Sequence, residues 1–583
     1  MKQTIHNMIR FCLILIFCLQ CFLNFAQSLP KVPFEKDQNT TSTYVELMEF
    51  YIHLDSLSPL IKVFSCGLSD IGKPIHTIVI ADNEDFTPER NIAAKKAIVF
   101  INNGIHPGEP DGIDASQLLV KEILSSKNLS GMLKKVTIVI IPVYNVGGML
   151  NRRSFSRANQ NGPVECGFRG NAKNLDLNRD FMKCDSKNAY TFNTVFNYWD
   201  PDIFIDTHTS NGADYQHTMT LIATHPQKLQ NPMAEEMQQN FLPHLYAAME
   251  QNGWPMTPYV NSEQGLSDGI QGFMDYPRYS TGYAALHQCY GFMSETHMLK
   301  PYKDRVNATL DFLKIAIQYT VQNKDKLRDS RQVSKTLASQ ITSFPILFEL
   351  DKNVQDSTLF LGYEEYMSPS KVTGLSIRKY DKSKPYRTYI PYFNHFKTTH
   401  SVRVPEAYIV PFAYGKIIDL LRINGAEIRT LSHDTIITST QYKIQDFKIP
   451  TYPYEGHFPL SDIILDSIIS TKTWYAGDAI VYSKSENLPY IIHSLEPLAP
   501  DSWMKWNAFD GILNQKEYFS DYVFDDVASS FVEEHPSLKL EIDKAKAENP
   551  TISNYQLLSI IYKHTPYFEP TLRLYPIGKI YQK

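Results

Sequence analysis

The chain has 583 residues, of which 43% are hydrophobic and 20% are charged. This length predicts roughly two or three globular domains, and the composition excludes a disordered or fibrous protein. The formal net charge is −5, so there is no excess of basic residues to hold a nucleic-acid backbone, and we expect no nucleic-acid partner.

The N-terminus has the pattern of an export signal rather than of a folded segment. Lys2 and Arg10 supply positive charge, residues 11–25 are mostly apolar, and Ala26 precedes the expected cleavage point. The apolar run is shorter than the ~20 residues that a membrane span requires. We therefore predict a signal peptide over residues 1–26, a secreted or periplasmic location, and no membrane span in the mature chain. A retained membrane anchor is the alternative.

The first half of the mature chain has the pattern of a layered α/β domain. Continuous apolar runs over residues 96–102, 136–143 and 202–206 predict strands buried on both faces, and residues 290–294 predict a weaker fourth strand. Strands that alternate with helices favour a mixed, largely parallel sheet with helices on both faces. Apolar residues at helical spacing occupy four further segments, 44–60, 113–124, 231–251 and 307–327.

The pattern changes near residue 330. Short strands rich in tyrosine and proline are expected over residues 341–405, and a strand–helix–strand unit over residues 407–431. Residues 502–563 are expected to be mainly helical. We therefore predict an accessory region over residues 331–583, β-rich or α+β and then helical, made of one or two domains. We assign no function to this region from its sequence.

Cysteine usage is compatible with export. Cys12, Cys18 and Cys21 would leave with the signal, although a lipid attached to Cys18 or Cys21 is a weaker alternative. The remaining cysteines allow three pairings, of which Cys166 with Cys184 is the most local. Free buried thiols are equally compatible with a chain of this size. These remaining cysteines are Cys66, Cys166, Cys184 and Cys289.

Two short motifs carry residues that suit a metal ion. His106 and Glu109 are separated by two residues in a loop after a predicted strand, and imidazole and carboxylate groups both suit zinc. His208, at the end of the strand over residues 202–206, supplies a distant third ligand. Two close ligands and one distant ligand, with a further position open to water, are typical of a catalytic zinc site. Each motif alone is also compatible with an ordinary polar loop or strand end.

Two further motifs supply groups for binding and proton transfer. Residues 174–181 include Asn178 and Arg179, and a guanidinium can hold a carboxylate through two parallel hydrogen bonds. Glu295 follows the predicted strand over residues 290–294, where a carboxylate can act as general base toward a water activated by a metal. A surface salt bridge for Arg179 and a solvated or capping role for Glu295 are equally compatible with each motif by itself.

The order of these motifs resembles that of zinc carboxypeptidases of the carboxypeptidase A superfamily. A His-x-x-Glu motif, an Asp-x-Asn-Arg motif, a strand-end His and a strand-end Glu follow one another along residues 106–295. The turn over residues 68–75 is similar as well, and the resemblance covers about residues 44–322. It implies a catalytic domain over residues 27–330. The later residues look more like the extension carried by some large bacterial members.

The resemblance implies a metal centre and a base on named residues. His106, Glu109 and His208 would hold one zinc ion per chain. Glu295 would take a proton from the water that the metal activates and later pass it to the leaving amine. Asp176 would orient the ring of His106.

The resemblance also implies groups that hold the substrate. Asn178 and Arg179 would bind the terminal carboxylate of a peptide. Arg169 would polarise the scissile carbonyl and hold the developing oxyanion, with Arg157 as the rival assignment. Tyr279 would close over the substrate, and the other tyrosines in the same stretch are Tyr276 and Tyr283.

The leading hypothesis is a secreted zinc metallocarboxypeptidase that hydrolyses the C-terminal bond of peptides with a free terminal carboxylate. A zinc deacylase of the aspartoacylase or succinylglutamate desuccinylase type resembles the same motif order, but that group is usually smaller and cytosolic. The motifs are also compatible with a cell-wall peptide hydrolase and with a non-enzymatic binding protein. The complete set of predicted ligands, together with Glu295, argues against the binding protein.

Overall fold

The computed structural model describes residues 29–262 and 265–581 of the chain. The signal peptide expected over residues 1–26 therefore lies outside the described residues. Within the described ranges, no helix is both long enough and apolar enough to cross a membrane.

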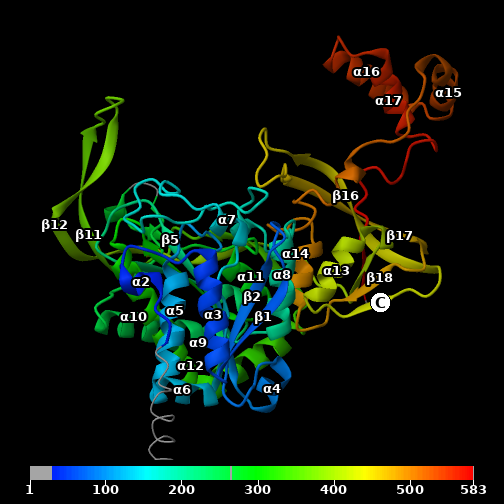
Figure 1. Cartoon of the computed structure of the whole chain (residues 1–583). Helices are drawn as coiled ribbons and strands as arrows, with labels where there is room; N and C mark the ends of the chain where they lie inside the picture. Colours follow the sequence, from blue (N-terminus) through cyan, green and yellow to red (C-terminus); the bar gives the residue numbers. More distant parts are fainter. Residues whose placement is uncertain (1–28, 263–264, 582–583) are drawn as a thin grey trace, which may run out of the picture.

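An eight-stranded sheet forms the centre of the first half of the chain, in the order β1-β2-β4-β3-β5-β9-β6-β7 (Figure 1). Its middle strands, β4, β3, β5 and β9, run parallel to one another, and all of their residues are buried, as their continuous apolar runs predict. These strands span Val136–Ile141, Ala97–Asn102, Ile203–Ser210 and Tyr290–His297. The outer strands are β1 (Ile61–Leu68), β2 (Pro74–Ile80), β6 (Met219–Ala223) and β7 (Thr257–Pro258).

Helices cover both faces of this sheet. On one face, aromatic side chains of α8 (Lys187–Trp199) pack against Phe100 of β3, beside α11 (Ser280–Leu286). On the other face lie α5 (Asp111–Ser125) and the long α12 (Tyr302–Ala338), which contact each other and the central strands. The predicted mixed, largely parallel sheet with helices on both faces is confirmed.

The four predicted helical segments differ from the observed helices mainly at their ends, and several short helices have no predicted counterpart. The segment predicted over residues 231–251 is interrupted by a π-helical turn, and α12 extends beyond the predicted 307–327 in both directions. The other helices are α2 (Pro33–Lys36), α3 (Tyr44–Leu57), α4 (Pro88–Ala93), α6 (Lys127–Gly131), α7 (Val146–Leu150), α9 (Met233–Glu236) and α10 (Leu242–Gln251).

The region after α12 is β-rich, as predicted. Its largest sheet has six strands in the order β15-β18-β14-β19-β16-β17. The main hydrophobic core continues from the first half into this region, where Tyr283 of α11 meets Tyr490 of α14. The elements are β10 (Ser343–Leu350), β13 (Phe396–Arg403), β14 (Ala407–Val410), α13 (Gly415–Ile423), β15 (Ile428–Thr430), β16 (Thr435–Lys448), β17 (Ser461–Trp474), β18 (Ala479–Tyr482), α14 (Leu488–Leu495) and β19 (Gly578–Ile580).

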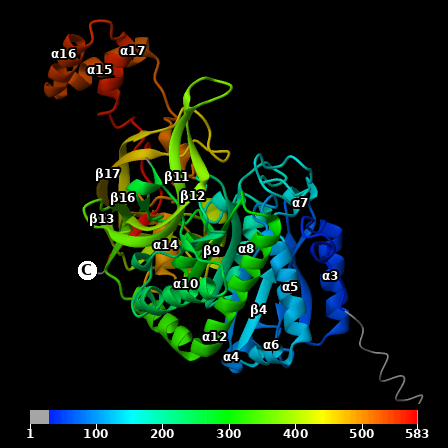
Figure 2. The ribbon, with the colours of Figure 1, turned by 90° about the vertical axis from the view of Figure 1, so that its left-hand side faces the viewer.

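Two parts of this region project from the body of the molecule (Figures 1 and 2). One is the hairpin of β11 (Asp356–Pro369) and β12 (Ser376–Phe393), so the prediction of only short strands over residues 341–405 is wrong there. The end of β12 pairs with the short strand β8 (Ile270–Gln271), but the rest of β12 pairs only with β11. A proline on an edge strand loses no ladder bond where its nitrogen faces away from the neighbouring strand. The other is a small helical bundle with its own core, made of α15 (Asp521–Glu534), α16 (Ser537–Glu548) and α17 (Asn554–Tyr562).

The cysteines of the described part of the chain are free thiols, so the local pairing of Cys166 with Cys184 is not formed. Burial raises the pKa of the Cys184 thiol well above its usual range, and that of Cys289 likewise. Their thiols therefore behave as small apolar groups in the core. The full set is Cys66, Cys166, Cys184 and Cys289.

Candidate active site

The sheet brings distant motifs together at the carboxyl ends of its middle strands. His106 and Glu109 lie in the loop that follows β3, whereas His208 and Glu295 lie near the ends of β5 and β9. Because β5 and β9 are parallel neighbours, their register places His208 directly beside Glu295. This edge of an open α/β sheet is where such sheets bind their ligands.

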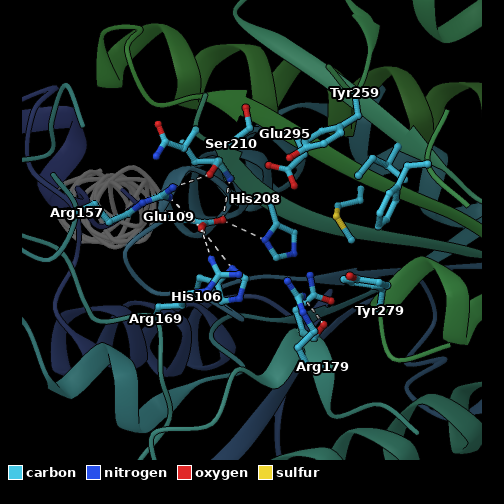
Figure 3. A pocket seen from close by; sticks show the side chains of 16 residues that line it. His106, Glu109, Arg157, Arg169, Arg179, His208, Ser210, Tyr259, Tyr279 and Glu295 are labelled. Carbon is cyan, nitrogen blue, oxygen red and sulfur yellow. Dashed lines mark hydrogen bonds and ion pairs between the residues drawn. The ribbon is translucent and has the colours of Figure 1, made fainter. Parts of the chain in front are cut away.

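His106, Glu109 and His208 form a buried group that can hold a metal ion (Figure 3). One possible ligand atom from each residue lies within 4.8 Å of the other two. Nδ1 of His106 lies 3.3 Å from Oε1 of Glu109, and Nδ1 of His208 lies 3.1 Å from Oε2. The three residues that the sequence predicts as ligands are thus side by side in the structure.

Two aspartates hold the outer nitrogens of these histidines. Nε2 of His106 lies 2.8 Å from Oδ1 of Asp176, and Nε2 of His208 lies 2.8 Å from Oδ2 of Asp206. A ring that donates its Nε2–H to a carboxylate keeps a free lone pair on Nδ1. Among the described residues, Nδ1 of His106 is buried and makes no hydrogen bond. Two imidazoles held in this way, with one carboxylate between them, fit a zinc ion.

Glu109 also faces the two arginines that are rival candidates for the carbonyl-polarising group. Nη1 of Arg157 lies 2.9 Å from Oε1 of Glu109, and Nη1 of Arg169 lies 3.3 Å from the same oxygen. Arg169 is also held by Asp176, whose Oδ2 lies 2.8 Å from Nη2. Burial opposes ionisation of Glu109, but Arg157 and His106 outweigh it and hold the pKa of Glu109 well below its usual range. Both arginines therefore lie against the predicted ligand Glu109.

Glu295 lies above His208 in the view of Figure 3, with its carboxylate directed into the cavity. Its side chain belongs to β9 and is buried, and it lines the same cavity as the metal group. Burial raises the pKa of Glu295 to about 7, against the opposing charge of His208. A carboxylate with a pKa near the working pH can both take and return a proton.

The proposed substrate-binding residues line the same cavity of about 270 Å³. Asn178 and Arg179 come from the turn after Asp176, and the guanidinium carbon of Arg179 lies 4.5 Å from the ring centre of Tyr279. The other two tyrosine candidates are elsewhere. Tyr283 is fully buried and donates to Asn424, and Tyr276 lines a different pocket.

Several residues of the site are not predicted by the sequence analysis. Asp206 is assigned no role there, although alternation along a strand places Asp206 and His208 on one side of β5. The rest of the cavity wall comes from β5, β6, β9 and the segment between β7 and α11, and no motif marks it. These wall residues are Thr209, Ser210, Asn211, Ile222, Tyr259, Phe273 and Met293.

Comparison with protein families agrees with this geometry. Residues 48–234 match the family model of zinc carboxypeptidases. The chain contains a zinc carboxypeptidase domain. The family assignment made from the motifs is confirmed by this match, and with it the enzyme class, a hydrolase of the metallocarboxypeptidase type. The predicted ligands His106, Glu109 and His208 fall within the matched residues, and Glu295 follows them.

Solved structures similar to this chain include three carboxypeptidases. A metallo-carboxypeptidase from Burkholderia cenocepacia is 16% identical, with a TM-score of 0.35 over 47% of this chain and 68% of that chain. One from Pseudomonas aeruginosa, in complex with (2-guanidinoethylmercapto)succinic acid, is 14% identical, with a TM-score of 0.37 over 49% and 69%. Carboxypeptidase A from Helicoverpa armigera is 13% identical, with a TM-score of 0.36 over 48% and 74%. No curated protein matches the chain.

Proposed function

We propose that this protein is a zinc metallocarboxypeptidase that removes the C-terminal residue of peptides. The proposal is carried by one observation. A single cavity joins a His–Glu–His group, a buried glutamate and an arginine that can hold a carboxylate. These are the groups that hydrolysis of a C-terminal peptide bond requires at one place.

In this proposal the catalytic groups lie on adjacent strands and on one loop. His106, Glu109 and His208 would hold one zinc ion. When bound, zinc polarises a carbonyl oxygen and makes a neighbouring water more acidic. Glu295, beside His208 in the sheet register, would take a proton from the attacking water and return it to the leaving amine.

The substrate would be held by other residues that line the same cavity. Asn178 and Arg179 would bind the terminal carboxylate, and Tyr279 would cover the bound residue. Arg169 would stabilise the oxyanion, with Arg157 as the rival. The substrate class is therefore a peptide with a free C-terminal carboxylate.

Glu295→Gln tests the proposed base directly. We expect the wild type to contain about one zinc ion per chain and to cleave a free-acid peptide but not its C-terminal amide. The variant should keep its zinc and lose at least ~10² of its turnover, because the amide cannot accept the proton. Elemental analysis and peptide hydrolysis measure both quantities, with Glu49→Gln on the exposed side of α3 as control.

The same assay separates the competing functions. Preferential release of acyl groups from acylated amino acids would indicate a deacylase, and cleavage confined to cell-wall peptides would indicate a cell-wall hydrolase. Zinc binding without any hydrolysis would leave only a binding protein. Retained peptide cleavage in Glu295→Gln would remove the base from this residue.

Export and domain division stay predictions. Export depends on residues 1–26, and the N-terminal sequence of the protein recovered from outside the cytoplasm would test it. We propose that residues 27–330 form the catalytic domain and that residues 331–583 form the accessory region.

A further inference from the structure

A turn of the C-terminal region contacts the loop that carries Asp176 and Arg179. The turn spans Tyr454–His457: the backbone N of Tyr454 donates to O of His457 at 2.7 Å, and the reverse bond measures 3.1 Å. Its two central residues, Glu455 and Gly456, have φ values of 50° and 79°. Positive φ at both positions is the geometry of a type I′ hairpin turn. The tip of the turn therefore has a defined shape.

Two side chains of this turn bind residues of the candidate active site. The hydroxyl oxygen of Tyr454 accepts a hydrogen bond from Nε of Arg179 at 2.9 Å. Oε2 of Glu455 accepts a bond from the backbone N of Asp176 at 2.8 Å. Asp176 in turn touches His106 and Arg169. The C-terminal region thus contacts both the carboxylate-binding arginine and the aspartate behind the metal group.

The turn is itself held by a buried ring and by two surface hydrogen bonds of the C-terminal region. The ring of Tyr454 stacks on Trp506, with ring centres 6.1 Å apart and planes 21° apart. Trp506 is 3% exposed. The backbone N and O of Phe458 exchange two hydrogen bonds with the side chain of Asn507, at 3.1 and 2.9 Å. A hydroxyl fixed in this way can hold its partner in one orientation.

The contacts of Arg179 leave one edge of its guanidinium for a ligand. Nε donates to Tyr454, and Nη1 donates to O of Asn178 at 2.8 Å and lies 3.9 Å from Oδ2 of Asp176. One face of the group stacks on Tyr279. The Nη1–Nη2 edge keeps N–H groups that can grip a carboxylate through two parallel hydrogen bonds. Without the bond at Nε, the guanidinium could turn about the end of its flexible side chain.

We propose that Tyr454 is a positioning residue for Arg179, so that the C-terminal region supplies part of the subsite for the substrate's terminal carboxylate. This inference rests on the proposed function, because it assumes that Arg179 meets that carboxylate. The Tyr454 hydroxyl bonds to Nε and not to the metal group. Its loss therefore weakens the grip on a free carboxylate and leaves zinc content and the chemical step nearly unchanged.

Tyr454→Phe tests the proposal, because it removes the hydroxyl and keeps the ring on Trp506. Binding of a free-acid peptide and of its C-terminal amide is measured by calorimetry in a Glu295→Gln background, in the full chain. We expect affinity for the free acid to fall about five- to tenfold, the effect of losing one ordinary hydrogen bond, and affinity for the amide to stay the same. In hydrolysis, KM for the free acid rises by a similar factor while kcat changes less than about twofold.

Two controls separate positioning from general damage. Tyr452→Phe, at a side chain that is 80% exposed, should change neither affinity. In Arg179→Gln, adding Tyr454→Phe should have no further effect on free-acid binding, because the two residues act through one contact. An effect of Tyr454→Phe that persists without Arg179 overturns the proposal.

The outcomes also separate this inference from the proposed function. Unchanged free-acid affinity in Tyr454→Phe, or equal losses for acid and amide, overturns the positioning role while the wild type still hydrolyses peptides. A wild type that binds the acid more tightly than the amide but cleaves neither refutes the proposed function and leaves the positioning test intact. If the Glu295→Gln protein without further substitution binds the free acid no more tightly than the amide, the positioning role and the proposed function are both overturned.

Discussion

Each histidine of the metal group depends on an aspartate behind it. Asp176 and Asp206 lie 2.8 Å from the outer nitrogens of His106 and His208, and both aspartates are largely buried. The carboxylates determine which ring nitrogen carries the proton, and they increase the basicity of the other nitrogen. In the proposed site, the affinity for zinc should therefore depend on Asp176 and Asp206 as well as on the ligands.

Asp206→Asn should lower zinc affinity about 10- to 100-fold without unfolding the protein. The amide keeps the shape of the side chain but loses the charge that holds Nε2–H of His208. Competition with a chelator of known affinity measures the change. Asp329→Asn, at an exposed position on α12, is the matched control. Equal affinities in the wild type and Asp206→Asn would show that the neighbouring carboxylate is irrelevant to the metal.

The two arginines beside Glu109 can be ranked by substitution. Nη2 of Arg157 donates to O of Thr209 at 3.0 Å, whereas the Arg169 side chain is 47% exposed. Arg169 is bound to Asp176 and Glu109, but it is the more exposed of the two arginines, so a substrate carbonyl that enters from solvent can reach it more readily. We expect Arg169→Ala to lose about 10²–10³ of its turnover with zinc retained. Arg157→Ala should lose less in the same peptide assay, and the reverse ranking would transfer the role to Arg157.

At the level of elements, the start of α5 approaches β5 so closely that only glycine fits. A Cβ at Gly112 would lie 2.0 Å from Oγ1 of Thr207 and 2.6 Å from Oδ1 of Asn103. Helix α5 begins two residues after Glu109, so any shift of the helix moves the ligand loop. The packing of one helix end therefore sets the position of a predicted ligand.

Gly112→Ala should lower the free energy of unfolding by about 1–3 kcal/mol, because the added methyl group overpacks this contact. It should also weaken zinc binding. Urea unfolding and chelator competition measure the two effects. Gly131→Ala in α6 is the control, since a Cβ there meets no atom of the described residues within 4 Å, and it should be neutral or slightly stabilising. Wild-type stability in Gly112→Ala would show that the helix end can relax.

Across the whole molecule, several imidazoles are buried in their neutral form. Burial lowers the pKa of His217, His225 and His297 to about 4. The bonds of His217 explain why it stays neutral. Its Nδ1 donates to O of Pro255 at 2.9 Å, and its Nε2 accepts from N of Leu361 at 3.0 Å. A second proton on this ring would face an N–H group and have no acceptor.

These imidazoles should make the protein sensitive to acid. An unfolded histidine has a pKa of about 6.5, so the unfolded chain binds more protons than the folded chain between about pH 6.5 and about pH 4. The contribution of these histidines to the free energy of unfolding should therefore be fully present above about pH 6.5. It should be lost as the pH falls toward about 4, by up to ~1.4 kcal/mol per pH unit for each histidine.

Urea unfolding of chelator-treated protein at a series of pH values measures this dependence. His217→Gln should reduce the slope by the contribution of one histidine, even if the variant is less stable at every pH. A slope that is the same in the variant would show that His217 is not part of the acid response.

The sequence by itself determined the buried strands, the order of the motifs and the three residues that come together as the candidate metal group. Continuous apolar runs report burial on both faces of a strand, and ligand types and spacings are local properties of the chain. Only the tertiary structure decided that Asp206 holds His208, that Tyr279 rather than Tyr283 reaches the cavity, and that Tyr454 meets Arg179. That last contact joins residues 275 positions apart. No local pattern encodes such a pairing, because it follows from how two separately patterned regions pack against each other.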